Sequence, residues 1–217
     1  MWISFSWQTA SIVAGEHLGY ASDTVGFALT TGLGDAIGVG MGHCLFSAAK
    51  KSITADTSIN MERESQTGLL LATAAFFSGS CWQPVVNALQ GLELSFLQVF
   101  TGTWIGCGTA FYLGLRGART ILSGPCRYIQ EPSYENSMTD KSLSVAIGGA
   151  TGFFVGTDTA YLPTQNFLIN IVGINGTTPK LMGCAIAGTS TGLGFVVAQS
   201  TLNAIYPAGK LWNDSKK

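Results

Sequence analysis

Two aspartates lie deep within apolar stretches of this chain, and they are the residues with the clearest potential for chemistry. Asp35 is the only Asp, Glu, Lys or Arg between residues 24 and 49, and Asp158 is the only one between residues 142 and 179. A carboxylate among apolar groups is unfavourable by several kcal/mol unless it is neutral, paired or hydrated. We therefore expect each acid to be protonated, hydrogen-bonded across helices, or exposed to water or a cation.

Two proline elements of the form P-x-x-N supply further polar groups, at Pro84 and at Pro163. Each proline lacks a backbone N–H and so removes one hydrogen bond from a helix, and the carbonyl left free needs another partner. The neighbouring amides could repair the break and tie helices together, or they could form a paired polar site. These amides are Gln83, Asn87, Gln165 and Asn166, and with Asp35 and Asp158 they make up a candidate ion or polar path.

Both prolines belong to an internal repeat, which covers residues 73–108 and residues 150–194. Each copy has an apolar segment ending near P-x-x-N, a short link, and a second apolar segment carrying G-T-x-x-G-x-G. A fainter third copy opens the chain, where Trp7-Gln8 echoes Trp82-Gln83. Matched Gly and Pro interruptions in repeated apolar segments point to a binding site in membrane proteins.

Composition and charge spacing indicate a membrane protein. The chain has 217 residues, of which 47% are hydrophobic and only 11% are charged, against roughly 25% charged in a soluble domain. A bilayer core needs about 20 mostly apolar residues per helix, and several uncharged windows are long enough. These windows are 65–92, 94–115, 159–179 and 181–209.

The fold class that follows is all-α, a polytopic bundle of about six transmembrane helices in one membrane domain, 1–217. The expected helices are 2–18, 22–48, 66–90, 94–118, 142–172 and 179–206. They form tandem hairpins at 1–49, 66–119 and 142–206, joined by loops 50–65 and 120–141 and followed by a tail, 207–217.

Loop charge predicts the orientation of these hairpins. The two long loops, the end of the hairpin at 116–119 and the tail hold every Lys and Arg except Lys180. Basic residues near the spans favour the cytoplasmic-type side, so both termini and the long loops belong there. Each hairpin starts and ends on that side, and the repeats are therefore parallel, related by an axis near the membrane normal. The opposite rim collects Glu16, Asp23 and Glu93.

Many of the 28 glycines recur at four-residue spacing within the expected helices. Such a row forms a smooth groove that lets helix backbones approach closely. Packing within the bundle or a homo-oligomer contact would use these faces, whereas a phosphate-binding loop would need a strand-to-helix turn. The packing glycines are Gly34, Gly38, Gly42, Gly102, Gly106, Gly148, Gly152, Gly156, Gly188 and Gly192.

The sequence offers little for enzyme chemistry. It has two histidines, no H-E-x-x-H pattern and no nucleophile elbow, and its five cysteines form no C-x-x-C pair. His43, eight residues after Asp35, does not face it closely on a helix of 100° per residue. We expect no enzymatic activity, no cofactor and no nucleic-acid partner. The residue spacings in the sequence do not identify a metal.

An N-terminal stretch, S-F-S-W-Q-T-A-S-I-V-A-G-E-H-L-G at 4–19 and L-G-D-A-I-G-V-G-M-G at 33–42, resembles the transmembrane protein 65 family. That family has a helix G-F-x-D-N-x-x-M-I-x-A-G-x-x-I, then a helix bearing L-G-N-x-x-S-D-x-x-G. Here Trp7-Gln8 stands at the family's D-N pair, Gly38-Val39 at its S-D pair and Asp35 at its Asn. The resemblance implies a mitochondrial inner-membrane protein linked to sodium-dependent calcium efflux.

Two hypotheses for function follow. The first is a small transporter, channel or ion-handling protein whose path is lined by the intramembrane acids and the P-x-x-N elements. The second is a non-catalytic structural subunit that docks by its glycine-rich helix faces onto a larger respiratory or photosynthetic complex. A transporter needs its acids to face a wet cavity, whereas a subunit can bury them in helix contacts. Both place the chain in a lipid bilayer, with an organelle inner membrane expected, mitochondrial before plastid.

Overall fold

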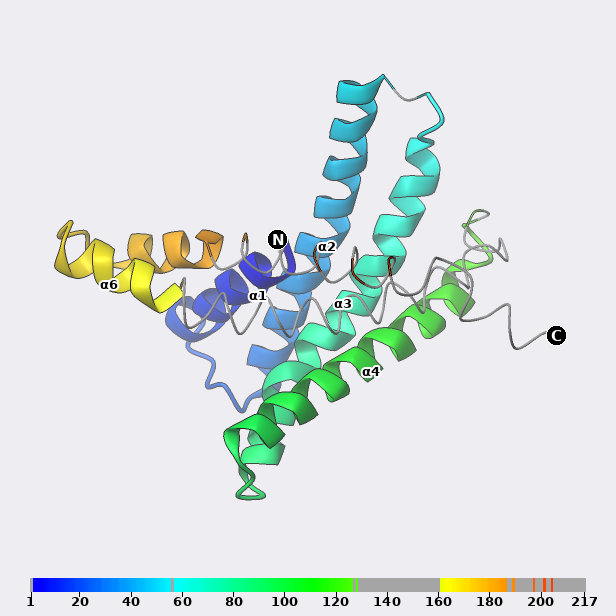
Figure 1. The fold of residues 1–217 in the computed structure, drawn as a ribbon. Coiled ribbons are helices and arrows are strands. Elements are labelled where there is room, and N and C mark those ends of the chain that lie inside the picture. Colours follow the sequence, from blue (N-terminus) through cyan, green and yellow to red (C-terminus); the bar gives the residue numbers. More distant parts are fainter. Residues whose placement is uncertain are drawn as a thin grey trace.

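The computed structural model describes residues 2–55, 57–126, 128 and 161–186, together with residues 189, 197, 201 and 204. Throughout these residues the chain is helical and contains no strand, which confirms the expected all-α class (Figure 1). The elements are α1 (Trp2–Ile12), η1 (Val13–His17), α2 (Val25–Thr54), α3 (Met61–Gln90), α4 (Phe96–Leu122) and α6 (Leu162–Asn170).

Helices α2 and α3 are longer than the apolar windows predicted, so the expected loop 50–65 shrinks to a short link. Polar residues of good helix propensity, such as Lys50 and Glu62, continue each helix beyond its apolar part. The helix starts are set by side-chain caps: the Thr24 hydroxyl accepts from the Phe27 N–H, and the Asn60 side chain accepts from the Glu62 and Arg63 N–H groups. At α4, Ser95 and Gln98 form a capping box.

The first expected helix, 2–18, is two elements in the structure. α1 has 11 residues and continues into the five-residue π-helical turn η1, after which Gly19 turns the chain with φ of 70°. Together α1 and η1 extend about 24 Å, less than the roughly 30 Å of a bilayer core. Ser6 and Ala10 of α1 lie against Gly34 of α2.

Helix α3 is the centre of the packing. It runs antiparallel to α2, as Figure 1 shows, and α4 follows the half of α3 farther from the α2–α3 link. On the α2 side, Gly32 lies against Ser80 and Gly40 lies against Ala72. Small residues at these contacts bring the α2 and α3 backbones close together.

The α3–α4 contact is antiparallel as well. Gly102 lies against the Leu89 side chain and Gly106 against Val85. Farther along the pair, a buried apolar cluster joins the two helices and the turn after α4. Its members are Leu70, Ala74, Ala75, Phe111, Leu115, Ala118 and Cys126.

One helix of the described residues, α3, is long and apolar enough to cross a membrane, and only 22% of its most apolar window is buried within the protein. Most of the other residues of this window are half-buried rather than exposed. The six-span arrangement stays a prediction.

The described C-terminal part is a second hairpin. α6 is followed by a link in which Gly173 and Gly176 have φ of 76° and 85°, and residues 177–186 are again helical. Pro163 lies near the start of the described part of α6, whereas Pro84 lies inside the continuous helix α3. An ion pair between Lys180 and Glu16 ties this hairpin to η1.

A candidate polar junction around Asp35

Asp35 lies on the inner face of α2, where α1 and α3 both approach. The residue is only 5% exposed, and the Ser6 hydroxyl donates a hydrogen bond to its Oδ1 at 3.5 Å. Among the described residues, no Lys, Arg or His forms an ion pair with this carboxyl group. The sequence expectation of an acid without a basic neighbour on its own helix therefore extends to the neighbouring described helices.

Gly79 of α3 provides the space for the Asp35 side chain. A Cβ atom at position 79 would lie 2.5 Å from Asp35 Oδ2, closer than any real contact of this kind. One turn earlier on α2, a Cβ atom at Gly32 would lie 1.9 Å from Ser80 Oγ. Glycine at both positions lets a carboxyl group and a hydroxyl group fit between two close backbones.

The carbonyl of Gly79 is where the three helices meet. The indole Nε1 of Trp7 on α1 donates to it at 3.4 Å, and the hydroxyl of Thr31 on α2 donates to it at 3.4 Å. Thr31 is completely buried. The Thr31 hydroxyl has a single proton and lies closer, at 3.0 Å, to the carbonyls of Phe27 and Ala28 on its own helix. The two contacts with the Gly79 carbonyl are therefore weak, but they show that α1 and α2 meet α3 at the level of Asp35.

Several buried oxygen atoms near this level lack a hydrogen-bond partner within the described part of the chain. They include Ser80 Oγ on α3 and, on α1, Gln8 Oε1 and Thr9 Oγ1. A buried polar atom without a partner is unfavourable by about 1–3 kcal/mol and calls for an explanation such as an ion, a water molecule or a conformational change.

The amides beside Pro84 bond to each other. Gln83 Nε2 donates to Asn87 Oδ1 at 2.9 Å, and both side chains are half-buried. Of the second pair, Gln165 is half-buried and Asn166 is exposed on α6. Asp158 lies outside the described residues, and its place in the path stays a prediction.

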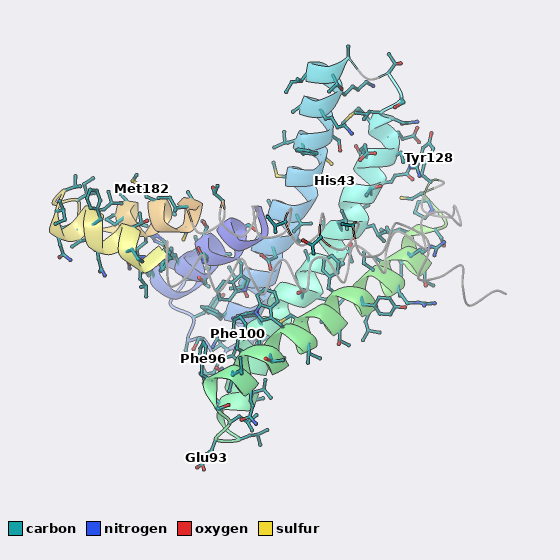
Figure 2. The ribbon with its side chains drawn as sticks, viewed as in Figure 1. His43, Glu93, Phe96, Phe100, Tyr128 and Met182 are labelled. Carbon is teal, nitrogen blue, oxygen red and sulfur yellow. The ribbon has the colours of Figure 1, made fainter. Side chains whose placement is uncertain are left out.

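His43 belongs to a separate polar cluster, nearer the α2–α3 link. Its Nε2 lies 2.8 Å from Glu64 Oε2, and the Ser47 hydroxyl donates to the same oxygen at 3.0 Å. Figure 2 shows His43 on the length of α2 that rises beside α3, whereas Glu93, Phe96 and Phe100 mark the opposite end of the molecule. A direct Asp35–His43 relay is therefore absent from this arrangement.

The packing glycines occupy different contacts. Gly34 faces α1, Gly38 and Gly42 are buried in α2, and Gly102 and Gly106 face α3. The glycines expected to pack in the second repeat lie outside the described residues. They are Gly148, Gly152, Gly156, Gly188 and Gly192.

An aromatic series borders the junction. The rings of Trp7 and Trp82 lie 6.0 Å apart edge to face, and those of Trp82 and Trp104 lie 4.9 Å apart. Phe100 continues the series along α4, 6.3 Å from Trp104. Through these rings α1, α3 and α4 make a continuous apolar wall beside the Gly79 carbonyl.

Sequence reasoning missed four residues of the junction: Ser6, Thr31, Gly79 and Ser80. One signal was available for Thr31, which precedes Asp35 by four residues and so shares its helix face. Gly32 and Gly40, eight residues apart, likewise mark the α3-facing side of α2. Ser6 and Gly79 are brought to Asp35 by the tertiary packing of separate helices, which no spacing in the sequence encodes.

Neither protein-family models, nor curated proteins, nor solved structures show a match to this chain. In the described residues, no group of three or more His, Cys, Asp or Glu could hold a metal ion. The chemical case for this site consequently depends on its own geometry, a single buried carboxyl group surrounded by hydroxyl, carbonyl and indole groups.

Proposed function

We propose that this protein is an integral membrane protein that handles a cation or a proton at the Asp35 junction. The observation that carries the proposal is a carboxyl group, 5% exposed, held between three helices with one hydroxyl donor and no cationic partner among the described residues. Intramembrane acids of this kind mark ion and proton pathways in many transport proteins.

The outer face of α2 supports the proposal that α2 spans the membrane in addition to α3. Large apolar side chains recur there every fourth residue, and each is about half exposed or more. They are Val25 (74%), Leu29 (49%), Leu33 (54%), Ile37 (52%), Met41 (59%) and Leu45 (53%). This stripe is about 30 Å long, which equals the thickness of a bilayer core, while Thr31 and Asp35 face inward.

The polar groups of the junction suit a proton or a cation that binds to Asp35 and is released again. A bare carboxylate in these surroundings is strongly unfavourable, so Asp35 either carries a proton or holds a cation. The other polar groups near it, among the described residues, are neutral oxygens, an indole N–H and the buried thiol of Cys107, which interacts electrostatically with Asp35. One negative charge among neutral oxygens favours a proton or a singly charged cation over a divalent ion, which usually takes several carboxylates.

Asp35→Asn tests the proposal in sealed vesicles that contain the purified full chain. We expect this variant to lose flux of the species carried, assayed as proton entry, sodium uptake and calcium uptake, and to melt close to the wild-type temperature. Asp23→Asn, at an exposed acid in the link before α2, is the matched control and keeps its flux. A wild-type protein that moves none of these ions would overturn the proposal.

A structural subunit is the second candidate, and the close contact of Asp35 with Gly79 favours it. Without a wet cavity at the acid, the carboxyl group would serve helix packing, and Asp35→Asn would lower the melting temperature and affect no flux. The outer face of α2 would then cover a neighbouring subunit. Native electrophoresis of the protein from gently solubilised membranes distinguishes the two candidate functions, because a structural subunit migrates with a large complex.

The resemblance to the transmembrane protein 65 family supports a mitochondrial inner membrane as the location, and a plastid membrane is the alternative. Fractionation of organelles with an antibody against the chain decides between them.

A further inference from the structure

Pro84 lies inside the continuous helix α3, six residues before its end. It has no backbone N–H, so the carbonyl of Ser80, four residues earlier, lacks the donor that an α-helix normally supplies. A carbonyl in this position must find another partner within the protein. Pro84 itself is exposed, so the ring is not needed to fill the protein interior.

Ser80 also carries the hydroxyl group that is buried without a partner in the described residues. This hydroxyl lies against Gly32, one helical turn from Asp35 on α2. Ser80 thus combines a buried hydroxyl group without a partner in the described residues and a carbonyl that cannot receive the usual helical donor from residue 84. Both groups lie on one residue beside the buried acid.

The two groups lie between the acid and the amide pair. Helix carbonyls point toward the C-terminal end, so the Ser80 carbonyl is directed toward the turn that holds Gln83. Gln83 is in turn bonded to Asn87, and α3 ends at Gln90, before the loop with Glu93. Along α3, polar groups therefore lead from the level of Asp35 to the end of the helix.

We infer that Ser80 and Pro84 are positioning residues of the Asp35 site: Pro84 keeps the Ser80 carbonyl available, and the Ser80 oxygens form the polar step between Asp35 and the Gln83–Asn87 pair. This inference rests on the proposed function and adds the route by which the ion or proton reaches the acid. The step requires no covalent change, since oxygen lone pairs alone receive the cation or the proton.

The test compares two variants with two matched controls in sealed vesicles containing the full chain. Flux is read as acidification of a trapped pH-sensitive dye and as uptake of radioactive sodium. Pro84→Ala restores the helical hydrogen bond to Ser80, so we expect a higher melting temperature together with flux reduced about tenfold, the effect of losing one polar interaction. Gly124→Ala, just beyond the end of α4, where a Cβ would meet nothing within 4 Å, changes neither.

Ser80→Ala should lower flux to a similar extent without lowering the melting temperature, because the hydroxyl has no partner to lose. Ser78→Ala on the same helix is its control. If Asp35→Asn abolishes flux while Pro84→Ala and Ser80→Ala keep it, the inference is wrong and the proposed function stands. If the wild-type protein carries neither ion, both fall.

Discussion

At the scale of single residues, Gly79 has no side chain, and the carboxyl group of Asp35 fills the space that one would take. The same glycine offers its carbonyl to Trp7 and Thr31. Asp35 could be identified from the sequence, because a charged residue within an apolar stretch can be recognised without knowledge of the fold. It could not identify Gly79, since a glycine among 28 gains its role only from the helix that packs against it.

Gly79→Ala should destabilise the protein, because the added methyl group and the Asp35 carboxyl group cannot both fit. Overpacking of this kind lowers the free energy of unfolding by about 1–3 kcal/mol. The measurement is thermal unfolding of the purified protein in detergent, followed by circular dichroism.

Gly117→Ala on α4 is the control, since a Cβ at that position meets nothing within 4 Å. This substitution should raise stability by up to about 1 kcal/mol through helix propensity. Equal unfolding temperatures for the two variants would contradict the placement of Asp35 against Gly79.

At the scale of elements, α2 shows why mean composition is a poor guide to this chain. Its buried polar residues Thr31, Asp35 and Ser47 face inward while most of its large apolar residues face outward, so only the orientation of the helix separates the two sets. The sequence predicted α3 and α4 from uncharged windows, and α2 from a window whose only charged residue is Asp35. Their true ends differ because side-chain caps and residues of good helix propensity, rather than charge, decide where a helix begins and ends.

Ile37→Lys tests whether the outer face of α2 contacts lipid. A lysine at the centre of a span is unfavourable by about 3 kcal/mol, so we expect a smaller fraction of this variant to resist alkaline extraction from membranes. On a water-exposed face the same change would have little effect.

Ala49→Lys, near the end of α2 beside Lys50, is the control and should insert as the wild type does. Full retention of the Ile37→Lys variant in the membrane would argue that this face of α2 lies outside the lipid.

At the scale of the whole molecule, Glu16 and Lys180 are 164 residues apart in sequence and pair with each other. The charge distribution predicts both to lie on the same side of a membrane, and the orientation stays a prediction. The first part of the second repeat, residues 150–160, lies outside the described residues, and the rotational relation between the repeats stays a prediction.

Cysteine labelling tests the proposed orientation, in a variant whose five native cysteines are replaced by serine. Because α3 separates the two links, we expect Ser58→Cys and Gly91→Cys to react from opposite sides of sealed vesicles. Asn175→Cys, in the link after α6, should react from the same side as Gly91→Cys. If Ser58→Cys and Gly91→Cys react from one side, α3 does not cross the bilayer.

The edge-to-face series of Trp7, Trp82 and Trp104 has an optical consequence. These indoles are close enough to exchange excitation energy, so their fluorescence behaves as one signal from the region beside the Gly79 carbonyl. With Trp2 and Trp212 replaced by phenylalanine, all tryptophan emission would come from this series. The protein thus contains its own spectroscopic reporter, through which a change of charge on Asp35 can be followed in real time without an added dye.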